Sequence, residues 1–176
     1  MNWALLIYRL PAEPSRHRVA VWRKLRRVGA LSLQQATWAV PSRADFLDGV
    51  ERAASLVEVA QGEAIVLDVE PRGDESRARL EAAFTADREA EWTEFLGECN
   101  KYEDELEKEI RTKKFTPAEL TEEEQNLDRL RRWYRDLRAR DVFKAPPSDE
   151  CDRRLKECTH KLEEFAERVF KEVERQ

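Results

Sequence analysis

The sequence predicts an α+β fold in which a ferredoxin-like βαββαβ sheet unit is followed by three long amphipathic α-helices. Two observations carry this prediction. Short apolar runs and helical patterns alternate through the first seventy residues in the order β-α-β-β-α-β. Beyond them, apolar positions step by three and four along three long stretches, as in packed helices. We therefore predict a ferredoxin-like unit over residues 1–72 and a helical hairpin or bundle over residues 73–176.

The first strand and helix have clear boundaries. Residues 3–10 are mostly aromatic or aliphatic, and Pro11 closes the run, which predicts a buried strand. Apolar residues at helical spacing predict a helix over residues 16–28, and Gly29 stands where a C-cap glycine is expected.

The next segment, residues 30–40, alternates poorly as one strand. It fits better as two short strands, 31–33 and 36–40, joined by a tight turn at Gln34 and Gln35. A single strand here, which would leave a three-stranded sheet, is the alternative.

A second helix and a closing strand complete the sheet unit. Ser42 is a good N-cap residue with Asp45 three positions later, so it is expected to open a helix that ends by Gly62. The apolar run in residues 63–70 predicts the last strand.

Three helices are predicted after residue 73. The first covers residues 74–114. The segment Thr116-Pro117-Ala118-Glu119 is a capping box with proline at the first helical position, so it starts a second helix that runs to about Asp141. A proline pair at positions 146 and 147 breaks the chain, and Ser148 is expected to cap the third helix.

Composition narrows the class of protein. The chain is 41% apolar and 39% charged with mean hydropathy -0.78, and its fifteen aromatic side chains can build a core, so we expect exposed helices rather than disorder. The net charge of -5 argues against diffuse nucleic-acid binding but permits a local basic face. The N-terminal apolar run is too short to span a membrane, and three cysteines, an odd number, fit the reduced cytoplasm.

No catalytic or metal-binding motif is apparent, so we predict a non-enzymatic protein without a cofactor. The two histidines, His17 and His160, lie far apart in the sequence. Cys99, Cys151 and Cys158 fall on apolar stripes, which favours buried, inert thiols; a soft-metal or redox-sensing face is the alternative.

Basic residues form two clusters. The first comprises Arg16, Arg18, Arg23, Lys24, Arg26 and Arg27, a basic helix that suits phosphate or another oxyanion. The second aligns Arg131, Arg135 and Arg138 at helical spacing, which suits an oxyanion because arginine forks match such ions. For both clusters, pairing with the acidic helix that lies between them in the sequence is the alternative.

Several segments carry a family resemblance. They are residues 5–23 (LLIYRLPAEPSRHRVAVWR), 29–35 (GALSLQQ), 114–120 (KFTPAEL) and 138–143 (RARDVF), together with Trp133. In order and spacing they resemble the N-terminal domain of ChrB, a family associated with chromate-resistance operons and their chromate-responsive regulation. The first seventy residues also resemble, more weakly, the ferredoxin-like domain of PaaX-type repressors and of CRISPR-adaptation endonucleases. Those nucleases have an acidic residue at the end of the first strand, where this chain has Tyr8-Arg9-Leu10, so nuclease activity is not expected.

The resemblance implies a DNA-associated transcriptional regulator of a chromate-resistance system that acts as a cytoplasmic homodimer. With it, the first basic cluster, from Arg16 to Arg27, becomes the expected DNA-binding face. It makes chromate, or another oxyanion, the expected ligand of the second basic cluster. Full-length family members carry a further C-terminal domain that is not in this sequence. The alternative is therefore an interaction or dimerisation module that partners a separate chromate-resistance protein, for which the amphipathic helices supply apolar surface.

Overall fold

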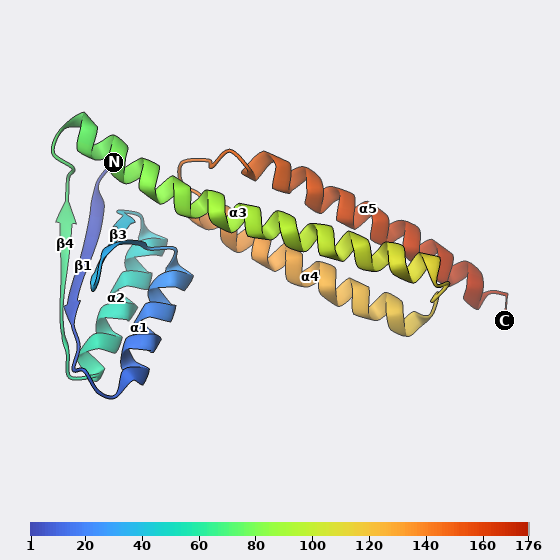
Figure 1. The fold of residues 1–176 in the computed structure, drawn as a ribbon, viewed down its shortest axis with the longest axis horizontal. Helices are drawn as coiled ribbons and strands as arrows, with labels where there is room; N and C mark the ends of the chain where they lie inside the picture. The colour runs from blue at the N-terminus through green and yellow to red at the C-terminus, as the bar shows by residue number, and fades with distance from the viewer. Residues whose placement is uncertain (176) are drawn as a thin grey trace. The chain divides into compact units, whose positions relative to one another are not determined.

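The chain forms two compact units. The computed structural model describes residues 1–175 and divides them into Met1–Asp87 and a second unit that begins at Arg88. Figure 1 shows the first unit as a sheet with two helices beside it and the second unit as three long helices.

The first unit is built on a four-stranded antiparallel sheet. Its strands are β1 (Trp3–Arg9), β2 (Leu31–Gln34), β3 (Thr37–Pro41) and β4 (Glu63–Val69), in the order β2-β3-β1-β4. The hairpin between β2 and β3 turns through Ala36, whose φ is 60°. The predicted α+β class with a ferredoxin-like sheet unit is confirmed, and the hairpin excludes the three-stranded alternative.

Two helices cover one face of this sheet (Figure 1). They are α1 (Ser15–Val28) and α2 (Ala44–Val59). On this face Leu6 of β1 lies opposite Trp38 of β3, and Ala4 lies opposite Val40. All four residues are buried. Burial of these alternate strand positions forms the core of the unit.

Gly49 of α2 lets the two helices approach closely. A methyl group added at Gly49 would lie 2.4 Å from Cγ2 of Val28 on α1, well inside van der Waals contact. At its C-terminal end α1 stops at Gly29, which adopts the left-handed conformation (φ 84°) as predicted. The packing of α1 therefore depends on a glycine at a position where helix propensity alone would favour alanine.

The third helix, α3 (Gly73–Arg111), belongs to both units. Phe84, which is fully buried, packs edge-on against Trp3 with ring centroids 5.6 Å apart and against Phe46 at 5.9 Å. The first unit consequently extends past the predicted boundary at residue 72, because the first turns of α3 complete its core.

The second unit is a helical bundle of the rest of α3, α4 (Pro117–Arg140) and α5 (Ser148–Val173). Its core consists of apolar residues from all three helices, including Trp92, Phe95, Leu106, Leu127, Leu137, Leu162 and Phe165. The helices are long, but within residues 1–175 none has the length and apolar composition needed to cross a membrane.

One predicted N-cap is confirmed and two are wrong. The Thr116 hydroxyl accepts a hydrogen bond from the Glu119 backbone N–H at 3.2 Å and opens α4. Ser42 does not cap α2, because its N–H donates to the Asn2 carbonyl (2.9 Å) and keeps it beside β1, so that the helix begins at Ala44. Ser148 is the first residue of α5 rather than its cap.

We predict that Gly49→Ala lowers the free energy of unfolding by about 1–3 kcal/mol, because the new methyl group must displace Val28 or separate the helices. Urea denaturation followed by circular dichroism measures the effect.

Gly97→Ala is the matched control. A Cβ at Gly97 of α3 meets no atom within 4 Å. This substitution should therefore raise stability by up to about 1 kcal/mol through helix propensity alone. Equal stabilisation by both substitutions would show that α1 and α2 are not in close contact.

Candidate functional site

A basic groove of about 710 Å³ lies beside α1 in the first unit. Its walls come from α1, the end of β1 and the β2–β3 hairpin. Its charged and aromatic lining residues are Tyr8, Arg9, Arg18, Trp22, Arg26 and Trp38. None of the described lining residues is acidic.

The rotation of α1 about its axis determines which side chains enter the groove. Val21 and Leu25 are fully buried under the helix. Arg18, Trp22 and Arg26 follow one another at intervals of four residues, and each such step turns a helix by only about 40°, so they form one line along the groove. Trp22 is about half exposed, so one part of its indole is open to the groove.

The groove has the chemistry of a site for anions that carry a flat ring or a sugar. Guanidinium groups form forked hydrogen bonds to phosphate, and an indole offers a face for stacking. The Arg9 Nη2 atom pairs with Glu63 Oε2 at 2.8 Å, but both side chains are largely exposed. Such a pair contributes little to stability, so a phosphate can compete for Arg9.

The predicted DNA-binding residues separate into two groups. Arg18 and Arg26 line the groove. The other four lie outside its lining: Arg16, Arg23, Lys24 and Arg27. Three of these four are exposed on a face of α1 about 120° away from the groove, and the lysine is half-buried.

Four of the charged and aromatic groove residues were not predicted as site residues: Tyr8, Arg9, Trp22 and Trp38. The spacing from Arg18 through Trp22 to Arg26 could have indicated the tryptophan, since it repeats every four residues. The two residues at the end of β1 come together with α1 only through the sheet, so no local pattern indicates them.

The three arginines predicted to bind an oxyanion have three different surroundings on α4. Arg131 pairs with Asp128 at 3.2 Å. Arg135 is exposed and has no polar partner among the described residues. Arg138 makes a small contribution to the lowered pKa of Asp152, whose main cause is a hydrogen bond from a lysine. The oxyanion site therefore stays a prediction.

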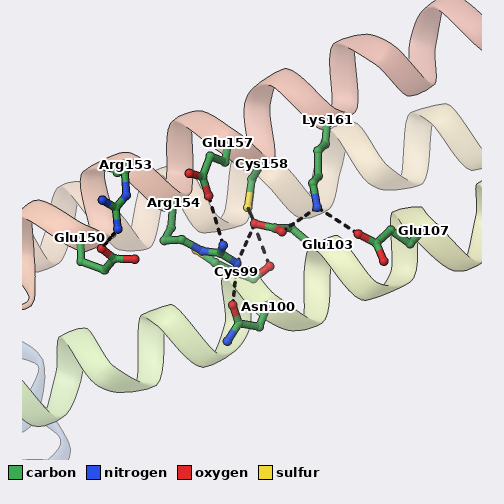
Figure 2. A network of polar contacts seen from close by, with 10 residues as sticks. All are labelled: Cys99, Asn100, Glu103, Glu107, Glu150, Arg153, Arg154, Glu157, Cys158 and Lys161. Carbon is green, nitrogen blue, oxygen red and sulfur yellow. Dashed lines mark hydrogen bonds and ion pairs between the residues drawn. The ribbon is translucent and has the colours of Figure 1, made fainter.

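A partly buried ion-pair network joins α3 to α5 in the second unit (Figure 2). Glu103, with only 10% of its side chain exposed, contacts Arg154 Nη2 at 2.8 Å and Lys161 Nζ at 2.7 Å. The Cys158 thiol points at the same carboxylate, with its sulfur 3.7 Å from Oε1. Hydrogen bonding to Glu103 raises the pKa of Lys161, so its ammonium group stays charged through neutral pH.

All three cysteines are free and buried, which confirms the burial expected from their apolar stripes. Burial raises the pKa of Cys151 to about 12, and a hydrogen bond with Cys99, together with burial, raises the pKa of Cys158. Within residues 1–175 no group of three or more histidine, cysteine or acidic side chains is arranged to hold a metal ion. The ion pairs of Glu103 with Arg154 and Lys161 link α3 to α5.

We predict that Glu103→Gln lowers the free energy of unfolding by about 1–3 kcal/mol, because it leaves two cations without their shared, mostly buried counter-ion. Chemical denaturation at neutral pH measures the loss.

Glu107→Gln provides the comparison on the same helix. Glu107 also contacts Lys161, at 3.1 Å, but 65% of its side chain is exposed. Its removal should cost less than about 1 kcal/mol. Equal losses from the two substitutions would contradict the role given to the burial of Glu103.

Comparison with known proteins places the chain in a family. The family model described as "Protein ChrB, N-terminal" matches residues 18–176, which include most of the sheet unit and all of the bundle. Protein ChrB of Cupriavidus metallidurans is 26% identical over 98 residues. That alignment covers 56% of this chain but only 30% of the relative, so the matched part spans less than a third of the relative's length. This chain belongs to the ChrB N-terminal family.

Proposed function

We propose that the chain is a non-enzymatic, DNA-associated regulatory domain of a chromate-resistance system, and that the groove beside α1 binds the DNA backbone. The observation that carries the proposal is the meeting of Arg9, Arg18, Arg26 and Trp22 in one concave surface. Membership of the ChrB family supports a role in regulating chromate resistance.

The acidic net charge is compatible with this role because charge is unevenly distributed. The net charge is -5, yet the described groove lining contains arginines and no carboxylate. Binding of a phosphate depends on the local field near the groove, and salt screens charges more than about 8–10 Å away at physiological ionic strength. Carboxylates of the bundle, such as Glu103, are compensated by cations beside them.

The spacing of the groove residues suits a phosphate chain. Arg18 and Arg26 are eight residues apart, which separates them by about 12 Å along α1, so they reach different phosphates. Trp22 lies between them and is placed to contact a sugar or an unstacked base. Contacts of this kind position a protein on DNA without reading its sequence.

A second candidate function is a protein-interaction module, favoured by Phe170 and Val173, which are exposed near the C-terminal end of α5. If α5 binds a separate ChrB protein, Phe170→Asp should weaken that complex by more than tenfold. Light scattering of the chain mixed with full-length Protein ChrB measures it, and unchanged binding would contradict this role for α5.

The DNA proposal is tested by fluorescence anisotropy with a labelled duplex from the chain's own promoter region. With three arginines on phosphates, the slope of log K against log salt should be about -3. Arg18→Ala should weaken binding by about fivefold or more and bring the slope nearer to zero by about one unit. Trp22→Ala should weaken binding while leaving the slope unchanged, because the indole carries no charge.

Arg23→Ala is the control, since it removes the same charge from the same helix outside the groove. It should change affinity by less than about twofold, in line with the weak effect of distant, screened charges. Absence of binding by folded protein at low salt would overturn the proposal, as would equal losses from Arg18→Ala and Arg23→Ala.

A further inference from the structure

The two edges of the sheet in the first unit differ in how they are protected. Free strand edges are usually blunted by short strands, bulges, charges or proline, because an unpaired edge can bind another strand. β2 follows this rule, with four residues and a register shift between Ser32 and Gln34. β4 is less protected: it has seven residues, pairs with β1 in unbroken register and contains no proline. Its two charged residues, Glu63 and Asp68, lie toward the ends of the strand and leave its centre uncharged.

β4 is also apolar and exposed on both of its faces. Ile65, Val66 and Leu67 have relative exposures of 57%, 41% and 42%. Ile65 and Leu67 lie opposite Ile7 and Leu5 of β1 and share their face of the sheet, whereas Val66 lies on the other face. A helix laid on the sheet could cover only one of these faces. Only another strand, paired along the edge, covers side chains on both faces and satisfies the free backbone groups.

We propose that β4 pairs antiparallel with β4 of a second copy of the chain, about a two-fold axis at Val66, to form a continuous eight-stranded sheet. A two-fold axis normal to the sheet requires each pair to join residues on the same face. Centring the axis on Val66 overlaps all seven residues, from Glu63 to Val69, and places Ile65 beside Leu67 of the second copy. If the axis lay at Ile65 or Leu67 instead, fewer residues of the two β4 strands would be paired.

The side chains of β4 are compatible with a copy of itself as the partner, because Ile65, Val66 and Leu67 meet the same three apolar residues of the second copy at the centre of the pairing. In this register Glu63 lies opposite Val69 of the second copy, and Asp68 lies opposite Ala64 of the second copy. No two carboxylates are directly opposed, although both strands are acidic, so the pairing avoids the like-charge repulsion that an acidic strand usually meets in its own copy. Glu63 also keeps its ion pair with Arg9, at 2.8 Å.

This dimer leaves the groove beside α1 open. The groove is formed by α1 and the β2–β3 hairpin, on the far side of β1 from β4 in the strand order. A two-fold axis normal to the sheet places the grooves of the two copies on the same face. The dimer does not require that the groove bind DNA, and its test does not use DNA.

Analytical ultracentrifugation of the full chain between 1 and 100 μM tests the proposal. The wild type should be a dimer in this range. Val66→Lys places two ammonium groups at the two-fold axis and should raise the dimer dissociation constant at least tenfold. Leu33→Lys is the matched control: Leu33 is similarly exposed, at 46%, on the opposite edge, and its substitution should leave the dimer intact.

Cross-linking tests the register without depending on the lysine variant. Because the native cysteines are buried, Val66→Cys introduces a single exposed thiol. Facing thiols at the axis should form an intermolecular disulfide on mild oxidation, since paired antiparallel residues have Cα atoms about 4.5–5.5 Å apart. Leu33→Cys should stay monomeric on a non-reducing gel. A monomeric wild type at 100 μM, a dimer unaffected by Val66→Lys, or equal cross-linking of both cysteine variants would overturn the proposal.

Discussion

Close packing of α1 on α2 is the constraint on which the candidate site depends. Gly49 leaves room for Val28, and burial of Val21 and Leu25 then fixes the rotation of α1 about its axis. Because positions four residues apart stay on one line, this rotation turns Arg18, Trp22 and Arg26 together toward the β2–β3 hairpin. A helix rotated by a third of a turn would present the other arginines there instead. The groove is therefore a consequence of core packing and not of the basic composition of α1 alone.

Helices pack on the faces of the sheet but not along its two edges, and the edges and the groove are the surfaces left for partners. α1 and α2 protect one face, while Phe84 of α3 packs on Trp3, a residue of the other face. The short, irregular β2 edge lies beside the groove, and the regular β4 edge lies at the opposite side of the sheet. Backbone hydrogen-bonding groups at an edge need partners wherever water is excluded. The basic concave surface and the apolar edge therefore lie on opposite sides of the sheet.

Charged side chains are also distributed differently in the bundle and in the groove. In the bundle, Glu103 has two cations within hydrogen-bond distance, and Arg131 pairs with Asp128 on its own helix. In these ion pairs the positive and negative side chains neutralise one another. In the groove the described lining has arginines without carboxylates, apart from the exposed pairing of Arg9 with Glu63 just outside. A protein with an acidic net charge can therefore present a positive field over a small area.

The sequence by itself determined the order of elements, the α+β class and the family, because apolar periodicity and turn residues act over a few positions. It also indicated the capping box at Thr116 and the burial of the cysteines. It failed at Ser42, whose N–H donates to the carbonyl of Asn2, just before β1, while α2 begins two residues later at Ala44. Only the tertiary structure decided which arginines of α1 share a groove with Arg9 and Tyr8, and which edge of the sheet is left open. Both features join residues that are distant along the chain, and their positions follow from packing rather than from any local pattern.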